Sequence, residues 1–323
     1  MSRPVLDVRG LRVKLPTAAG HATVVDGVDY RVEPQQVFGV AGESGSGKTM
    51  SVLAILGLLP RGAVVEGEAW FGGRDLLRLP ARERRAIAGR EIAMVFQDPM
   101  TSLHPMLDIG HQLCEHVRHH LGLSRAQAEL RACELLALVR IPDPAGALGR
   151  YPHQFSGGMR QRIAIASALA CDPAILVADE PTTALDVTVQ AGIVRLLDRL
   201  RRESGLSVVL ITHDLGVMSS IADRVSIFYA GRVVESGTRE DVIQRARHPY
   251  TRGLLDALPH PEHERTPLVA IPGTPPSPQQ LPSGCRFHPR CAYRTATCEQ
   301  AVPTLVDVAD EHELACLVDP FAA

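Results

Sequence analysis

A glycine-rich loop in the first fifty residues has residue types and spacing that suit phosphate binding. The loop reads Gly42-Glu43-Ser44-Gly45-Ser46-Gly47-Lys48-Thr49, with Met50 next, and it follows an apolar run at 37–41 that predicts a buried strand. Glycines permit the tight turn that points successive backbone N–H groups inward, and a predicted helix at 49–59 adds its positive end. Lys48 can then reach the β- and γ-phosphates, and the Thr49 hydroxyl can ligate magnesium. The loop therefore predicts binding of a nucleoside triphosphate with Mg²⁺.

A second apolar run, at 174–178, ends in the acidic pair Asp179-Glu180. A carboxylate at the C-terminal tip of a parallel strand can hold the magnesium ion and its waters beside a phosphate loop, and we assign this role to Asp179. Glu180 lies one residue further on and can act as general base toward an attacking water. This pair predicts that the triphosphate is hydrolysed.

Two polar residues follow further predicted strands. Gln97 comes after the run at 91–96, and His213 comes after the run at 207–212. Ligands of open α/β sheets collect outside the carboxyl ends of the strands, so both side chains are expected near the phosphate loop. Gln97 can contact magnesium or the attacking water, and His213 can hydrogen-bond the γ-phosphate. With Lys48 and Glu180 they form the predicted catalytic set.

A further motif, Phe155-Ser156-Gly157-Gly158-Met159-Arg160-Gln161-Arg162, has no evident use within its own chain. A serine and two glycines at a predicted helix start suit an anion, because backbone N–H groups and the positive helix end meet there. The motif suggests that the chain completes a nucleotide site on a partner. It predicts an ATPase that works as a clamp of two subunits.

These motifs, in this order, resemble the ATP-binding subunits of ABC transporters along almost the whole chain. The matching segments are the Walker A loop at 42–49, the Q-loop Gln97-Asp98-Pro99-Met100-Thr101-Ser102-Leu103, the signature Phe155-Ser156-Gly157-Gly158-Met159, the Walker B strand at 175–179, the D-loop Thr183-Ala184-Leu185-Asp186 and the switch histidine His213. The signature departs from the family pattern, with phenylalanine for leucine and methionine for glutamine. The resemblance implies that Ser156, Gly157 and Gly158 face the γ-phosphate of ATP bound by the other subunit.

The adenine site departs from the family pattern. The family usually stacks an aromatic side chain on the base, whereas this chain offers Leu15, with Val24 and Val25 nearby. Stacking of a base on an aromatic ring is worth about 1–3 kcal/mol. We therefore expect modest nucleotide affinity or base selectivity.

The pattern of predicted strands and helices gives an α/β fold, a RecA-like P-loop NTPase core. Residues 1–98 and 171–258 are expected to form the nucleotide-binding core with a small antiparallel β subdomain. The core includes a strand with apolar and polar residues alternating at 28–32, a helix at 187–203 with one apolar face, and a hairpin at 228–235 that turns at Ala230-Gly231. Residues 99–170 are expected to form an inserted helical subdomain that carries the signature and includes a helix at 124–139. Residues 259–323 form a C-terminal extension, and the nine prolines between 259 and 289 predict an extended path there.

Composition limits the other classes of function. The 323 residues carry a net charge of −2, which gives no electrostatic case for a nucleic-acid partner. No apolar run reaches the roughly 18–20 residues that span a bilayer, and the N-terminus lacks the apolar stretch of a secretion signal. We therefore expect the chain to reach a membrane only through partners.

Four of the seven cysteines, Cys285, Cys291, Cys298 and Cys316, cluster in the last forty residues. Unrelated thiols are one interpretation, but four in so short a tail, in a chain poor in cysteine elsewhere, favour a shared role. Disulfides are disfavoured in the cytosolic setting that an ATPase implies, so the shared role that we predict is metal binding. Four thiolates suit either zinc or an iron–sulfur cluster, and the spacing C-x5-C-x6-C-x17-C matches neither the close pairs of most zinc sites nor the ferredoxin run. His288 and His312 are near enough in sequence to substitute as ligands.

The tail adds a second resemblance. The segments His248-Pro249-Tyr250-Thr251-Arg252-Gly253-Leu254-Leu255, Ile271-Pro272-Gly273-Thr274-Pro275-Pro276 and Cys285-Arg286-Phe287-His288-Pro289-Arg290-Cys291 resemble the C-terminal extension of the oligopeptide and dipeptide permease ATPases. Members of that group carry a [4Fe-4S] cluster on such cysteines. The resemblance therefore favours iron–sulfur over zinc, with a structural role ahead of a redox-sensing one.

The resemblance implies an energy-coupling ATPase of a bacterial ABC importer, most simply for di- and oligopeptides. Its expected partners are a second, related ATPase chain, two transmembrane permease subunits and, through the complex, an extracytoplasmic substrate-binding protein. Its expected place is the cytoplasmic face of the cell membrane. The alternative is the same role in an importer of nickel or another small solute. A non-transport ABC protein is a further alternative, and so is a regulatory subunit without catalytic activity. The intact Lys48, Glu180 and His213 argue against an inactive subunit.

Overall fold

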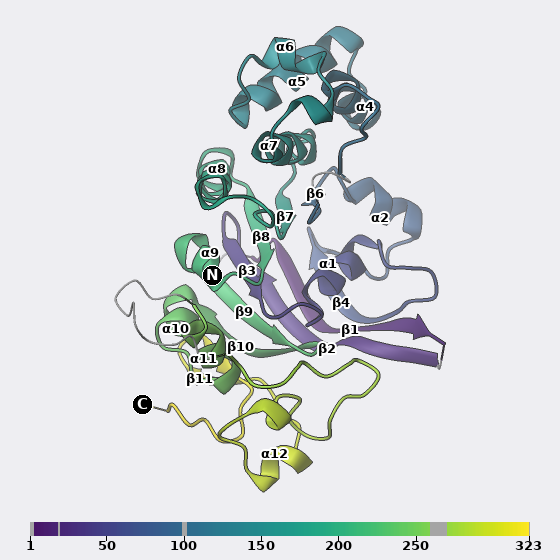
Figure 1. The fold of residues 1–323 in the computed structure, drawn as a ribbon. Helices are drawn as coiled ribbons and strands as arrows, with labels where there is room; N and C mark the ends of the chain where they lie inside the picture. The colour runs from purple at the N-terminus through teal and green to yellow at the C-terminus, as the bar shows by residue number, and fades with distance from the viewer. Residues whose placement is uncertain (1–2, 19, 99–101, 259–269, 323) are drawn as a thin grey trace. The chain divides into compact units, whose positions relative to one another are not determined.

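The structure, a computed structural model, describes residues 3–18, 20–98, 102–258 and 270–322 (Figure 1). The chain forms two compact units. The first consists of Met1–Leu79 and Ile211–Ala323, and the second of Pro80–Leu210.

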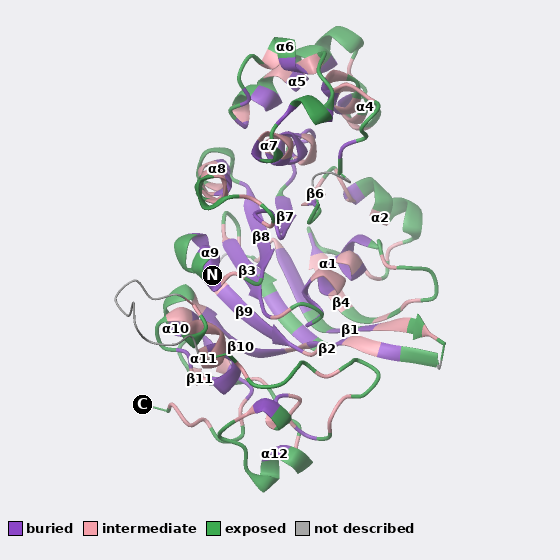
Figure 2. Ribbon diagram, in the orientation of Figure 1, coloured by how far each residue is buried: buried purple, intermediate pink, exposed green. Residues whose placement is uncertain are grey.

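One sheet of the first unit consists of antiparallel strand pairs. It contains β1 (Leu6–Thr17), β2 (Gly20–Val32), β4 (Val64–Phe71) and β5 (Arg74–Asp75) in the order β2-β1-β4-β5. The alternation expected along β2 is confirmed, because Val28, Tyr30 and Val32 are buried while Asp29 and Arg31 are exposed. Figure 2 colours each element by burial in this way. A strand with this period covers the core with one face and meets solvent with the other.

The other strands of the first unit lie in the order β11-β12-β10-β9-β3. They are β3 (Val37–Ala41), β9 (Arg224–Tyr229), β10 (Arg232–Thr238), β11 (Val306–Ala309) and β12 (His312–Leu314). β3 is parallel to β9, whereas β9 and β10 form an antiparallel hairpin. The predicted hairpin is confirmed, and its turn is at Ala230-Gly231, where both residues have positive φ.

Short helices complete the first unit. They are α1 (Lys48–Leu56), α9 (Leu215–Ile221), α10 (Arg239–Ile243), α11 (Pro249–Asp256), the 3-10 helix η2 (His288–Arg290) and α12 (Ala296–Gln300). α1 ends earlier than predicted because Gly57 adopts the left-handed conformation that closes a helix. Residues 270–287 form no helix or strand, as their prolines predict.

The second unit contains strands in the order β8-β7-β6. β6 (Ile92–Val95) is parallel to β7 (Ile175–Asp179), and β8 (Ser207–Thr212) continues at its last two residues into the first unit. Every residue of β7 and β8 is buried. Continuous apolar runs of this kind are typical of parallel strands covered on both faces.

Helices make up the rest of the second unit. They are α2 (Ala81–Ile87), α4 (Ile109–Leu121), α5 (Arg125–Leu138), α6 (Pro144–Leu148), the 3-10 helix η1 (Pro152–Gln154), α7 (Gly157–Ala168) and α8 (Val187–Ser204). The helices predicted at 124–139 and 187–203 are confirmed as α5 and α8. α5 begins with a capping box in which Ser124 and Gln127 satisfy each other's backbone N–H groups.

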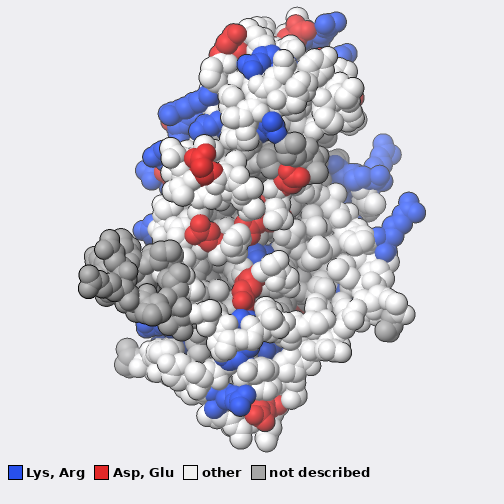
Figure 3. Space-filling model, in the orientation of Figure 1, with Lys and Arg blue, Asp and Glu red and all other residues white. Residues whose placement is uncertain are grey.

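Surface properties agree with the composition. On the face drawn in Figure 3, basic and acidic side chains both occur, in keeping with the net charge of −2. Within the described ranges, no helix has both the length and the apolar character needed to cross a bilayer.

Candidate nucleotide site and thiol cavity

The phosphate loop of the first unit is a close-packed backbone turn at the start of α1. Gly47 precedes the helix with φ of +101°, a conformation that other residues adopt only with strain. A Cβ atom at this position would lie 2.5 Å from the carbonyl oxygen of Val24 on β2. The neighbouring Gly231 N–H donates to the Ser46 carbonyl at 2.8 Å. Only glycine fits between the loop and these two segments.

Lys48 lies within the loop rather than on its outer surface. The residue is 6% exposed, and its Nζ donates to the carbonyl oxygens of Gly42 at 2.7 Å and Glu43 at 3.0 Å. Ser46 is also buried, and its Oγ has no hydrogen-bond partner among the described residues. A buried ammonium and a buried hydroxyl at a helix N-terminus suit an anion such as a triphosphate.

Glu43 is fixed at both its backbone and its side chain, which the sequence did not suggest. Its N–H donates to Tyr250 Oη at 2.8 Å, and its carboxylate accepts from Arg290 at 2.7 and 3.1 Å. Burial opposes the charged form of Arg290, but the hydrogen bonds to Glu43 and Tyr229 outweigh it, so the pKa of Arg290 is raised. The loop is therefore bound to residues more than two hundred positions away in the sequence.

The residues expected to contact the adenine ring lie on β1 and β2. Val25 is fully buried, while Leu15 and Val24 are half-buried. The carbonyl of Val24 faces Gly47, which brings β2 next to the phosphate loop. Thus Leu15 and Val24 keep some accessible surface, and Val25 belongs to the core.

The acidic pair of the second unit lies at a strained turn. Asp179 ends β7 and is 3% exposed, and Glu180 follows with φ of +48°, which is unusual for a residue with a side chain. Glu180 Oε2 accepts from Thr183 Oγ1 at 3.0 Å. Strain of this kind persists where the surroundings fix a side chain in one direction, and functional sites are enriched in it.

The signature segment forms the start of α7 in the same unit. Ser156 is exposed and is the N-cap residue, and its Oγ accepts from the Met159 N–H at 3.4 Å. Gly158 is buried, and a Cβ atom there would lie 2.4 Å from Val189 Cγ1 on α8. Asp186 caps α8 by accepting from the Val189 N–H at 2.9 Å. The starts of α7 and α8 therefore pack directly against each other.

Phe155, one of the two departures from the family signature, is a core residue. It is 3% exposed, and the Arg150 guanidinium lies 4.4 Å from the centre of its ring. Its larger side chain is therefore accommodated inside the second unit and leaves the following Ser156 and Gly157 exposed.

Gln97 and His213 both lie at strand ends, as predicted. Gln97 is exposed two residues after β6 in the second unit, and residues 99–101 of the predicted Q-loop lie outside the described residues. His213 is exposed directly after β8, in the first unit, and Asp214 next to it caps α9. The structure thus groups Glu43, Ser46 and Lys48 in one unit, and the acidic pair, Asp186 and Ser156 in the other.

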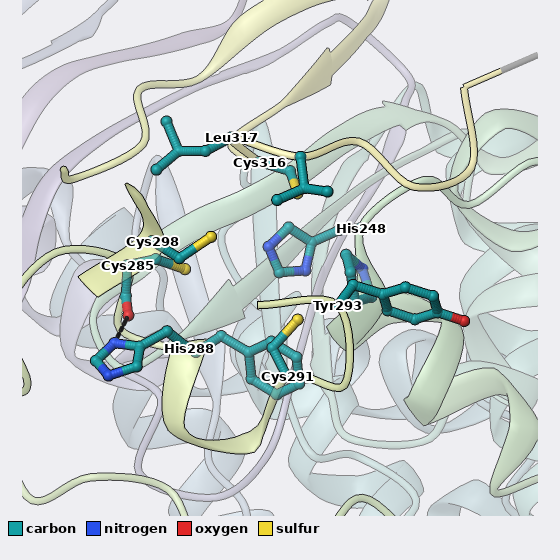
Figure 4. Close-up of a pocket in the computed structure, with 11 residues that line it drawn as sticks. His248, Cys285, His288, Cys291, Tyr293, Cys298, Cys316 and Leu317 are labelled. Carbon is teal, nitrogen blue, oxygen red and sulfur yellow. Dashed lines mark hydrogen bonds between the residues drawn. The ribbon is translucent and has the colours of Figure 1, made fainter. Parts of the chain in front are cut away.

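The four C-terminal cysteines line one cavity in the first unit (Figure 4). Cys285, Cys291, Cys298 and Cys316 surround it together with the buried His248. Its volume of about 20 Å³ is room for about one water molecule. Burial raises the pKa of the Cys285 and Cys291 thiols, and the other cavity cysteines raise it further.

The potential ligands around this cavity are not grouped closely enough to coordinate one metal ion. In the described part of the chain, no group of three or more His, Cys, Asp or Glu side chains is arranged to hold a metal ion. His288 lines the cavity, but its Nδ1 lies 2.9 Å from the Cys285 carbonyl oxygen. His312 is buried against Glu235, with Nε2 2.9 Å from Oε1. The two histidines considered as substitute ligands thus have other partners.

Comparison with known proteins gives two family matches and full-length relatives. Residues 25–183 match the ABC transporter family, and residues 234–298 match the C-terminal region of oligopeptide/dipeptide transporters. The chain is 46% identical over 298 residues to the oligopeptide transport ATP-binding protein OppD of Haemophilus influenzae, with 92% of each chain covered. It is 46% identical over 314 residues to the dipeptide transport ATP-binding protein DppD of Bacillus subtilis, with 97% of this chain and 94% of that one covered.

A solved structure supports the ATP-binding cassette fold. The dimeric post-hydrolysis state of the ATP-binding cassette MJ0796, bound to ADP and Pi, superposes with a TM-score of 0.65 at 27% identity. The match covers 72% of this chain and 98% of that chain.

Proposed function

The chain belongs to the ATP-binding subunits of oligopeptide and dipeptide ABC transporters, and on this premise we propose that it hydrolyses ATP to drive peptide import through a membrane complex. Its fold is the α/β P-loop cassette of that family. The observation that carries the proposal is the phosphate loop, in which Lys48 and the Ser46 hydroxyl are buried at the N-terminal end of α1.

In this proposal the loop at 42–50 binds the triphosphate through its backbone N–H groups, apart from that of Glu43, which donates to Tyr250. Lys48 exchanges its two carbonyl partners for phosphate oxygens, which offer a full negative charge in place of a dipole. Magnesium, when bound, neutralises phosphate charge, and Thr49, Asp179 and Gln97 are the residues that hold it or its waters.

Glu180 is the proposed general base toward the attacking water. The turn that fixes its backbone and the hydrogen bond from Thr183 hold its carboxylate in one direction. His213 then contacts the γ-phosphate and responds to its presence. General bases of this kind contribute about 10²–10⁴-fold to a rate.

The signature residues act on a partner subunit in this proposal. Ser156, Gly157, Gly158 and Met159 meet the γ-phosphate of ATP bound by a second ATPase chain, and Asp186 caps α8, whose start packs against the start of α7. The exposure of Ser156 and Gly157 supports this role, because a buried helix start has no surface to offer. The second ATPase is a related but different chain.

The remaining parts of the complex follow from this role. We place the chain at the cytoplasmic face of a bacterial membrane, with two transmembrane permease subunits and an extracytoplasmic binding protein that selects the peptide. Residues 1–98 and 171–258 are the nucleotide-binding core with its antiparallel β subdomain. Residues 99–170 are the helical signature subdomain, and residues 259–323 are the extension that carries the cysteines.

The four-thiol cavity is the proposed site of a [4Fe-4S] cluster. The resemblance of the tail to the peptide permease ATPases is what favours iron–sulfur over zinc, since no three or more His, Cys, Asp or Glu side chains of the described residues are arranged to hold a metal ion of either kind. Four thiols supply the donor set of a cluster, but the cavity of about 20 Å³ has room for about one water molecule, so the thiols must move outward to hold a cluster. A cluster held by Cys285, Cys291, Cys298 and Cys316 would cross-link 285–298 to Cys316 and stabilise the extension. Iron and sulfide analysis of purified protein tests this, and a colourless protein with one zinc contradicts it.

The test of the main proposal is Glu180→Gln in the assembled transporter. Phosphate release is expected to fall at least 10²-fold while ATP still binds, because the substitution removes the base and leaves the loop intact. Glu203→Gln, on the exposed end of α8, is the matched control and keeps wild-type turnover. Unchanged turnover in Glu180→Gln means that another group activates the water. Stimulation of turnover by a peptide-loaded binding protein, and not by a nickel-loaded one, tests the cargo.

A further inference from the structure

The segment from Cys285 to Cys291, whose end cysteines line the thiol cavity, contains two arginines, Arg286 and Arg290. Their side chains contact the phosphate loop and the segments packed against it. Arg290 is the more buried, with 5% of its side chain exposed. Its two terminal nitrogens contact both carboxylate oxygens of Glu43, at 2.7 and 3.1 Å, and its Nε donates to the Pro272 carbonyl at 2.8 Å. A bidentate pair fixes the direction of the carboxylate as well as its position.

Tyr250 holds the backbone of the same loop residue. Its ring is fully buried and packs edge-on against Tyr229, with centroids 4.6 Å apart. Its hydroxyl oxygen accepts the Glu43 N–H at 2.8 Å, so this amide points at the tyrosine and cannot point at a phosphate. The orientation of the first peptide of the loop is therefore set from outside the loop.

Arg286 supports the opposite side of the loop. Its guanidinium pairs with Asp26 on β2 at 2.5 Å and donates to the Ala230 carbonyl at 2.5 Å. The next residue, Gly231, donates its N–H to the Ser46 carbonyl in the phosphate loop. The two arginines thus constrain the loop at two points, one directly and one through the β9–β10 turn.

We propose that Arg290 is a positioning residue for ATP, and that the Cys285–Cys291 segment, with Tyr250, holds the phosphate loop in its binding conformation. The inference rests on the proposed function and adds a role for the extension in nucleotide affinity. A loop ordered before binding loses less conformational entropy when ATP arrives, so its affinity is higher. Arg290 touches neither ATP nor the reacting atoms, and its effect passes through Glu43.

The test measures ATP affinity rather than turnover alone. Arg290→Ala is expected to raise the Kd for ATP about tenfold, within the usual range of coupling between sites, and to speed hydrogen exchange of the amides at 42–47. At saturating ATP, kcat stays within about twofold of wild type, so the loss appears in KM. Arg290→Lys keeps the charge but loses the bidentate geometry, and it recovers part of the affinity.

Two further variants separate positioning from a general loss of structure. Arg294→Ala, an exposed arginine in the same extension, keeps wild-type Kd and melting temperature. Glu43→Gln raises Kd in the wild-type background and adds little in the Arg290→Ala background, because both changes break one pair. If Arg290→Ala does not fold, Arg290→Lys and Glu43→Gln carry the measurement.

The outcome that overturns the inference is a normal Kd and normal loop exchange in folded Arg290→Ala or, failing that, in Arg290→Lys and Glu43→Gln. Failure of the proposed function looks different, because wild-type protein then binds no ATP or shows no turnover that depends on Glu180. The inference is also overturned if Arg290→Ala and the control Arg294→Ala lose ATP affinity equally, since the effect is then not specific to the contact with Glu43.

Discussion

Gly158→Ala is expected to destabilise the second unit because the added methyl group has no room. The new Cβ atom would lie 2.4 Å from Val189 Cγ1, about 1 Å closer than ordinary contact. Val189 has little freedom to give way, since it is β-branched in a helix and its N–H is bound to the cap Asp186. The starts of α7 and α8 must therefore move apart.

The size of the effect follows from two opposing contributions. Overpacking of this kind costs about 1–3 kcal/mol, and replacing a helical glycine by alanine recovers up to about 1 kcal/mol. The net loss is therefore about 0–3 kcal/mol, with about 1–2 kcal/mol in the middle of that range. Val189→Ala removes both Cγ atoms and leaves its Cβ 3.6 Å away, an ordinary contact. The double variant Gly158→Ala/Val189→Ala is therefore expected to be more stable than Gly158→Ala alone.

Hydrogen exchange of the first turns of α7 and α8 is the direct assay, together with circular dichroism during urea unfolding. The single tryptophan, Trp70, lies in the first unit, so its fluorescence serves as a control that this unit is unchanged. A double variant no more stable than Gly158→Ala refutes the reasoning, because the contact with Val189 is then not the cause. If the double variant folds normally but the assembled complex lacks ATPase activity, the glycine has a further role at the phosphate.

Three other changes test separate parts of the fold. Burial and two neighbouring histidines lower the pKa of His116, so the unfolded chain binds a proton there more readily than the folded one. The free energy of unfolding is therefore expected to fall as pH drops below about 6.5. His116→Gln should flatten this dependence on pH, as measured by urea titrations at several pH values. Glu235, fully buried, accepts hydrogen bonds from His312 and two backbone N–H groups, so Glu235→Ala should cost about 3–5 kcal/mol, and an unchanged melting temperature contradicts this. Ser124→Ala removes the cap of α5 and should cost about 1 kcal/mol, with Gln127→Ala affecting the same box less.

Local signals predicted much of what the structure contains. The phosphate loop, the hairpin turn at Ala230-Gly231 and helices α5 and α8 depend on residues close together in sequence, such as glycines with positive φ and the N-cap Ser124. Burial along β2 follows its alternation of apolar and polar residues. The end of α1 was misjudged because Leu58 and Leu59 continue the apolar pattern past Gly57, whose backbone closes the helix.

Contacts over long sequence separations escaped prediction. Arg290 and Glu43 are 247 residues apart, and Tyr250 and Glu43 are 207 apart. Neither partner carries a local signal, because an arginine in a proline-rich segment reads as a solvated residue. The strands β11 and β12 were missed for a related reason, since each has at most four residues, and β12 pairs with the distant strand β10 while β11 pairs with β12.

The segment between Cys285 and Cys291 gives two functions to one short turn. Arg290 ends the 3-10 helix η2, and its guanidinium contacts Glu43 and lies 6.0 Å from the ring centre of Phe287. The next residue, Cys291, lines the thiol cavity, as Phe287 does. A rearrangement of Cys291 must shift the Arg290 backbone, because the two residues share a peptide plane. A ligand held by these thiols would thereby be connected to Glu43 and the phosphate loop through two adjacent residues.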